Sequence, residues 1–191
     1  MAVEYVNRKG QTYFLYEGET KTGKPKYYLS RQPAGTPMTS IPDGFEIYEN
    51  PNAQPFIRRQ LPKIIADDEL SLVESEVHRF ADLKYSLIDR KHTALTLYSV
   101  DNQREMIGAM RALGLVSGKA DVDDIARRFW TYSAVIRFTL VDATRRIFQT
   151  QRYCFLGAID DWIDIGKPGP LSALARRYIK HVGKDSFYDL F

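Results

Sequence analysis

The chain has 191 residues and a net charge of +3, from 27 lysines and arginines against 24 aspartates and glutamates. Hydrophobic residues make up 44% and charged residues 27%, as in ordinary globular proteins, which excludes a wholly disordered or fibrous protein. The single cysteine, Cys154, excludes an intrachain disulfide framework and a zinc site built from several cysteines.

The N-terminal residues MAVEYVNRKG lack the apolar core of a signal peptide. No stretch of the sequence approaches the roughly 18 consecutive apolar residues that a membrane helix needs. With the lone cysteine, these features predict a cytoplasmic protein that has no membrane partner. The 12 tyrosines and 10 phenylalanines favour β-strands, because aromatic side chains fit a half-buried pleated surface.

Residues 1–62 are expected to form a small module of β-hairpins. Short apolar and aromatic runs alternate there with turn residues, which is the pattern of paired strands. The first hairpin is expected over Tyr13–Tyr16 and Tyr27–Leu29, and the second over Phe45–Tyr48 and Phe56–Ile57. The letters LYEG and IYEN before the two turns resemble each other, so a duplicated hairpin and a chance likeness both remain open.

Residues 63–191 are expected to form an α+β domain of antiparallel hairpins that alternate with amphipathic helices. Helices are predicted from Asp67, from Asp101 to a stop at Gly114, and after Pro170, with a helical turn from Asp121. Hairpins are predicted over Tyr85–Ile88 with Ala94–Tyr98, and over Tyr132–Val141 with Ile147–Ile165.

The segment GETKTGKP, from Gly18 to Pro25, is close to a phosphate-binding loop. Such a loop needs a serine or threonine after the lysine to hold the metal, and a helix that points its N-terminus at the phosphates. Pro25 has no hydroxyl and no N–H, and the following KYYLSR indicates a strand. The segment is therefore expected to be a hairpin turn with Gly23 at positive φ.

The hairpin around this turn combines basic and aromatic residues, as single-stranded nucleic acid requires: charge for phosphates and flat rings for bases. Neighbouring tyrosines of one strand would point to opposite faces, so at most half of the rings could share one exposed surface. The alternative is that these lysines have no ligand, because surface lysines also keep strand edges soluble. The candidate contacts are Lys21, Lys24, Lys26, Tyr27, Tyr28 and Arg31.

A second basic segment holds six arginines between residues 127 and 152 against a single acid, Asp142. Arginine favours planar, bidentate binding of phosphate or carboxylate. The alternative is that these arginines pair with the acidic residues at 121–124 and 160–164 of the same domain. The candidate contacts from this segment are Arg137, Arg145, Arg146 and Arg152.

The acidic run DDWID invites a metal site. If the run is a strand, Asp160 and Asp164 share a face but start roughly 13 Å apart, too far for one ion. If it is helical, they come within about 5 to 6 Å and a magnesium site becomes conceivable. No histidine has a partner at metal-ligand spacing, and the sequence assigns no catalytic residue, metal or cofactor.

These features favour a non-enzymatic binding protein that contacts nucleic acid or an acidic protein through its two basic hairpins. One alternative is a protein–protein interaction or homo-oligomeric protein, in which an exposed strand edge adds to a partner's sheet. The other is a metal-dependent enzyme that uses Asp160, Asp161 and Asp164.

Overall fold

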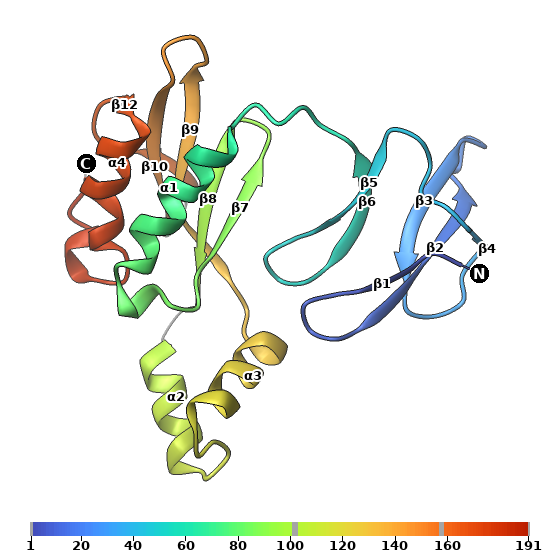
Figure 1. The fold of residues 1–191 in the computed structure, drawn as a ribbon, viewed down its shortest axis with the longest axis horizontal. Coiled ribbons are helices and arrows are strands. Elements are labelled where there is room, and N and C mark those ends of the chain that lie inside the picture. The colour runs from blue at the N-terminus through green and yellow to red at the C-terminus, as the bar shows by residue number, and fades with distance from the viewer. Residues whose placement is uncertain (1, 101–102, 157–158, 191) are drawn as a thin grey trace. The chain divides into compact units, whose positions relative to one another are not determined.

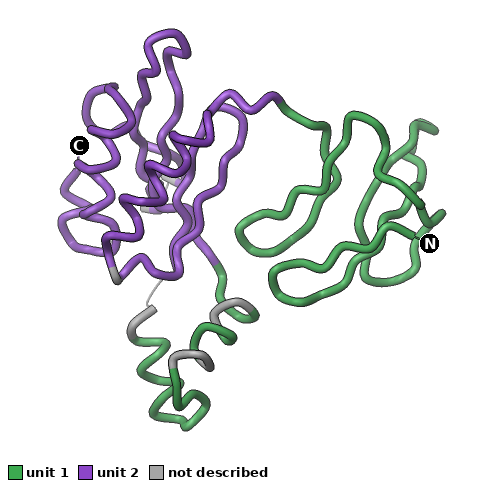
Figure 2. Tube along the Cα trace, in the orientation of Figure 1, with its two compact units in different colours: residues 1–61, 104–131 green, residues 62–103, 132–191 purple. Residues whose placement is uncertain are grey.

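The computed structural model describes residues 2–100, 103–156 and 159–190. The chain has a mixed α+β fold in which the paired strands are antiparallel (Figure 1). It divides into two compact units, residues 1–61 with 104–131 and residues 62–103 with 132–191 (Figure 2). The division into domains 1–62 and 63–191 stays a prediction.

Unit 1 begins with a four-stranded sheet of β1 (Glu4–Val6), β2 (Thr12–Glu19), β3 (Pro25–Ser30) and β4 (Thr36–Pro37). The long β2 is central, since it pairs with all three other strands, and its Leu15 is fully buried. Strands β5 (Phe45–Glu49) and β6 (Pro55–Arg59) form a separate hairpin. The two hairpins predicted here are confirmed.

Contacts on one face of β1–β3 connect this sheet to the β5–β6 hairpin. Tyr27 of β3 meets Phe45 edge-on, with 5.3 Å between ring centroids, and the hydroxyl of Tyr5 donates to Glu49 at 2.7 Å. Burial and this hydrogen bond to a carboxylate raise the pKa of Tyr5 to about 12. The buried Asn7 also donates from Nδ2 to the carbonyl of Ala53 at 2.7 Å.

The remainder of unit 1 is a pair of helices, α2 (Gln103–Ala112) and α3 (Lys119–Phe129). Gly114 ends α2 as predicted: its φ is +68°, and the N–H of Leu115 donates to the carbonyl of Met110 at 3.0 Å. The predicted cap Asp101 lies outside the described residues. The helical turn predicted from Asp121 is a longer helix that starts at Lys119.

Unit 2 is built on a sheet with the strand order β11-β10-β9-β8-β7. These strands are β7 (Leu87–Lys91), β8 (Ala94–Ser99), β9 (Ser133–Asp142), β10 (Ile147–Leu156) and β11 (Ile159–Asp164), and the short β12 (Gly169–Pro170) pairs with β10. Helices α1 (Asp67–His78) and α4 (Leu171–Tyr178) pack side by side on one face (Figure 1). The core between these helices and the sheet contains Val73, Leu97, Phe138, Phe148, Ala175 and Tyr178.

Two predictions for unit 2 require correction. The long strand expected over Ile147–Ile165 is two strands, β10 and β11, so three strands form a meander and the order of elements is not a strict alternation of hairpins and helices. Asp67 lies in the first turn of α1 but is not its cap. The cap is Ala66, whose N–H donates to the Glu69 side chain at 2.9 Å, while the Asp67 carboxylate pairs with Arg90.

Candidate binding surfaces

The segment that resembles a phosphate-binding loop is the turn between β2 and β3. The N–H of Thr20 donates to the carbonyl of Lys24 at 2.8 Å, and the Thr20 hydroxyl accepts from the N–H of Lys24 at 3.0 Å. Gly23 has a φ of +74°, as predicted. Because a strand rather than a helix follows, no helix N-terminus can point at a bound phosphate, and the turn is not a nucleotide-binding loop.

The lysines of this hairpin lie at its solvent-exposed end. Lys21, Lys24 and Lys26 are all exposed, and none of them forms an ion pair with an acid in the described parts of the chain. The ammonium of Lys26 lies 6.0 Å from the ring centroid of Tyr28. This hairpin therefore presents three cations whose charge is not matched by ion pairs within the described chain.

The two adjacent tyrosines of β3 point to opposite faces, as strand geometry predicts. Tyr27 packs on Phe45 on one face. On the other face Tyr28 stacks on Tyr16, with 6.2 Å between centroids, and its hydroxyl donates to the carbonyl of Ala34 at 3.0 Å. Both rings are half-buried and already have aromatic neighbours, so each has a structural role in this module.

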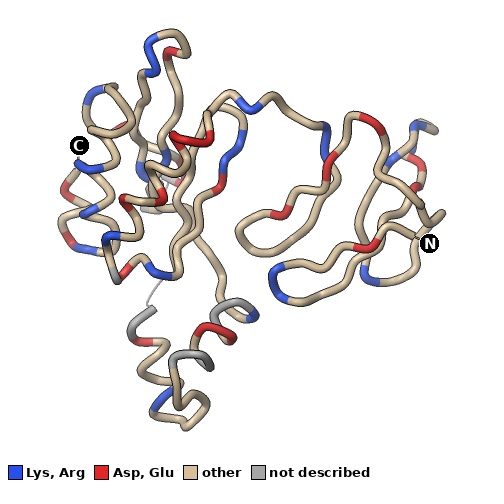
Figure 3. The backbone as a smooth tube through the Cα atoms, viewed as in Figure 1, with Lys and Arg blue, Asp and Glu red and all other residues tan. Residues whose placement is uncertain are grey.

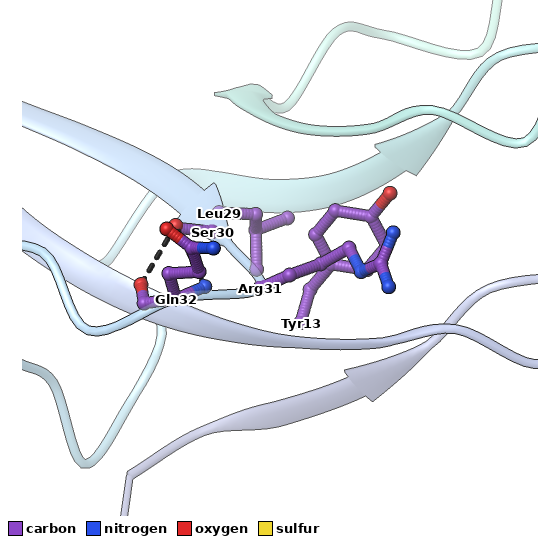
Figure 4. Close-up of a pocket in the computed structure, with 5 residues that line it drawn as sticks. All are labelled: Tyr13, Leu29, Ser30, Arg31 and Gln32. Atoms are coloured by element: carbon purple, nitrogen blue, oxygen red, sulfur yellow. Dashed lines mark hydrogen bonds between the residues drawn. The ribbon is translucent and has the colours of Figure 1, made fainter.

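An open groove of about 550 Å³ lies near the C-terminal end of β3. Figure 4 shows the Arg31 side chain extending toward the ring of Tyr13. Arg31 is exposed and has no acidic partner within the described ranges. The remaining lining residues are Leu29, Ser30 and Gln32. The groove therefore combines an aromatic ring with a guanidinium group that no described acid neutralises.

The four candidate arginines of the β9–β10 hairpin do not form one surface. Arg137 and Arg152 point to opposite faces of the sheet, because Arg137 lies opposite Gln151, the residue before Arg152. Arg152 lies on the face that the helices cover and is only 5% exposed. The prediction that it contributes to an accessible binding surface is therefore wrong. The 82% exposed Arg145 lies in the turn, 3.9 Å from Asp142.

Arg146 forms an ion pair that the sequence did not indicate. Its Nε donates to Glu69 Oε1 at 2.9 Å, and its Nη2 donates to the other carboxylate oxygen of Glu69. These hydrogen bonds raise the pKa of Arg146. The pair connects the β9–β10 turn to the start of α1. Arg146 therefore has an internal acidic partner, but this partner is Glu69 and not one of the acids at 121–124 or 160–164.

The acidic run at 160–164 is a strand, in which Asp160 and Asp164 are four residues apart on one face. Each carboxylate has a partner: Asp160 accepts from the hydroxyl of Tyr153, Asp161 from the N–H of Trp162, and Asp164 from Gln151. No group of three histidine, cysteine or acidic side chains that could hold a metal ion occurs within the described residues.

Sequence reasoning missed the surroundings of Arg137. Its Nε donates to Gln151 at 2.8 Å, and its guanidinium carbon lies 4.3 Å from the ring centroid of Trp162. Burial lowers the pKa of Arg137, and the carboxylates of Asp161 and Asp164 oppose that shift. The alternation of Gln149, Gln151 and Tyr153 was visible in the sequence, but the pairing of Gln151 and Tyr153 with β11 was not.

Charged residues of both signs are distributed over both units (Figure 3). No helix in the described ranges is long and apolar enough to span a membrane. No protein-family model, curated protein or solved structure matches this chain. The described side chains are therefore what indicates its function.

Proposed function

We propose that this protein is a non-enzymatic binding protein whose N-terminal hairpin module binds the phosphates of single-stranded nucleic acid. The observation that carries the proposal is the set of exposed cations on the β2–β3 hairpin that no acid of the described chain neutralises: Lys21, Lys24, Lys26 and Arg31.

Of these cations, Lys26 lies in β3 beside Tyr28, whereas Lys21 and Lys24 lie in the turn before β3 and Arg31 directly follows it. From Lys24 to Arg31 an extended chain spans about 23 Å, at about 3.3 Å per residue. A linear polyanion can contact both ends of such a strand, whereas a small anion can contact only one. At the Arg31 end, the groove offers the Tyr13 ring, and a flat ring beside a cation is the combination that binds an unstacked base. This favours a single strand over a duplex, whose bases are hidden.

The test is a fluorescence-anisotropy titration with a labelled single strand at about 50 and 200 mM salt. Four phosphate contacts give a slope of about −2.8 in log K against log salt, so binding should weaken roughly 50-fold over this range. The triple variant Lys21→Gln, Lys24→Gln, Lys26→Gln should retain a slope of about −0.7, which corresponds to one remaining contact.

The control is a second triple variant, Lys63→Gln, Lys91→Gln, Lys180→Gln, which removes the same charge from exposed positions of unit 2. It should bind nearly as tightly as the wild type. Equal losses in the two triple variants, or no binding at low salt, would refute the proposal. Equally tight, salt-dependent binding of polyglutamate would show that the hairpin selects acidic chains in general, and salt-insensitive self-association would favour an edge-strand contact.

A further inference from the structure

The face of the unit 2 sheet opposite α1 and α4 carries two adjoining rows of side chains. Strand alternation and the observed register place them together, since Gln151 lies opposite both Arg137 and Asp164, and Tyr153 lies opposite Trp162. The aromatic row consists of Tyr98, Tyr153 and Trp162, with Phe155 beside it, and the polar row consists of Thr96, Arg137, Gln151 and Asp164.

Arg137 is held in a fixed orientation at the centre of the polar row. Gln151 receives the hydrogen bond from Arg137 Nε and donates to Asp164 at 2.9 Å, and the guanidinium lies against the Trp162 ring. Among the described residues, no hydrogen-bond acceptor is found for the two terminal nitrogens of Arg137. A half-buried arginine thus presents open donors whose positions its neighbours have already fixed.

The aromatic row is also ordered by its neighbours. Tyr153 and Trp162 meet edge-to-face, with 5.2 Å between centroids and 78° between planes. The Tyr153 hydroxyl donates to Asp160, which fixes the ring further. Phe155 continues this face and is 79% exposed, so a large apolar ring is available for stacking.

We infer that this face binds an unpaired base of a single-stranded nucleic acid, an inference that rests on the proposed function. A base has a flat face that stacks on aromatic rings, and an edge that carries both acceptors and donors. The open donors of Arg137 suit the acceptors of such an edge, and the carboxylate of Asp164 suits its amino group.

The charge of this face argues against a phosphate ligand. Asp160 and Asp164 share this face with a single arginine, so the surface repels the backbone of a nucleic acid while it still offers hydrogen bonds to a neutral base. A protein that covered the face with an apolar surface would leave Arg137 buried without acceptors, which is unfavourable. A base supplies those acceptors.

The experiment compares a labelled oligonucleotide with an abasic phosphodiester chain of the same length. The wild type should bind the base-containing strand at least about fivefold more tightly, as expected from stacking of one base. Tryptophan fluorescence should be quenched by that strand only. Trp130 is 1% exposed, so the quenching reports on Trp162 and should disappear in Trp162→Phe.

Arg137→Gln and Phe155→Ser should each reduce binding of the base-containing strand toward that of the abasic chain, without changing the salt slope. Phe155→Ser alters an exposed side chain and so keeps the core intact. Arg145→Gln, an exposed arginine of the same hairpin, is the matched control and should leave the base preference unchanged. Equal binding of both chains without quenching would overturn this inference and leave the proposed function standing. Absence of binding to either chain would overturn both.

Discussion

Gly166 lies in the loop after β11, directly beside the Tyr178 hydroxyl in the core of unit 2. Its φ is +66°, and a Cβ atom built on it would lie 1.9 Å from the hydroxyl oxygen of Tyr178. The Tyr178 side chain is 2% exposed and has little room to move. Gly166→Ala should therefore combine a backbone penalty with a steric clash.

The two contributions can be estimated separately. A left-handed backbone conformation costs a non-glycine residue about 1–2 kcal/mol. Displacing a packed core ring costs about 1–3 kcal/mol more, as for other overpacked cores. The expected loss in the free energy of unfolding is therefore about 2–5 kcal/mol. Gly183→Ala is the matched control, since its φ is +78° and nothing lies within 4 Å of the new Cβ, so only the backbone penalty applies.

The assay is urea unfolding followed by tryptophan fluorescence, with Trp130 in unit 1 and Trp162 in unit 2, combined with a double-mutant cycle with Tyr178→Phe. The Tyr178 hydroxyl is buried and has no hydrogen-bond partner among the described residues, so its removal alone should be nearly neutral. Once Tyr178→Phe has removed that hydroxyl, the nearest ring carbon lies 3.1 Å from the new Cβ, and most of the clash disappears. If Gly166→Ala costs the same with and without Tyr178→Phe, or no more than Gly183→Ala, the steric argument is refuted.

Two further predictions concern unit 1. Asn7→Ala should lower its free energy of unfolding by about 2 kcal/mol, because Asn7 Oδ1 accepts from two backbone N–H groups and Nδ2 donates to Ala53. The corresponding hydrogen bonds of Asn50 are exposed to solvent. In the same urea titration, Asn50→Ala should therefore lower the free energy of unfolding by about 1 kcal/mol less than Asn7→Ala does. The pKa of Tyr5 rises from 10.0 to about 12 in the folded protein, so the unfolded chain loses this proton first and stability should fall as the pH rises from 10.0 to about 12. Tyr5→Phe should lack this component, and identical pH profiles for the two proteins would contradict it.

The sequence predicted local structure well because turns and helix ends depend on nearby residues. Gly23 and Gly114 occupy backbone conformations that favour glycine. The sequence predicted a turn at Gly23 and a helix end at Gly114. Asp142 likewise marks the β9–β10 turn, where its side chain accepts from the N–H groups of Thr144 and Arg145.

The sequence could not predict which side chains meet across strands, because strand register depends on the whole sheet. A register shift at Leu97/Tyr98 changes the pairing of β8 with β9, and no local pattern announces it. The pair between Arg146 and Glu69 joins residues 77 positions apart. For the same reason the six arginines looked like one basic surface, whereas the structure sends Arg137 and Arg152 to opposite faces.

The turns of unit 1 show how a likeness between hairpins arises from physical requirements. In the turns at Asn7–Gln11, Thr20–Lys24 and Asn50–Gln54, the first N–H donates to the fifth carbonyl, at 3.0, 2.8 and 3.0 Å. The fourth residue of each turn has a positive φ, at Gly10, Gly23 and Ala53. In every turn the first side chain accepts from the fifth N–H.

Duplication of a hairpin remains a hypothesis, but the structure gives it a definite form. When the turns Thr20–Lys24 and Asn50–Gln54 are superposed in sequence, Pro25 matches Pro55, whereas the tyrosines of LYEG and IYEN differ by two positions. The arginines of SRQP and RRQLP differ by the same two positions on the returning strand. Two extra residues on each strand lengthen a hairpin without exchanging its faces, because side chains alternate with a period of two. The longer hairpin is the one that carries the exposed lysines, so such an extension would have placed these cations beyond the packed part of the sheet.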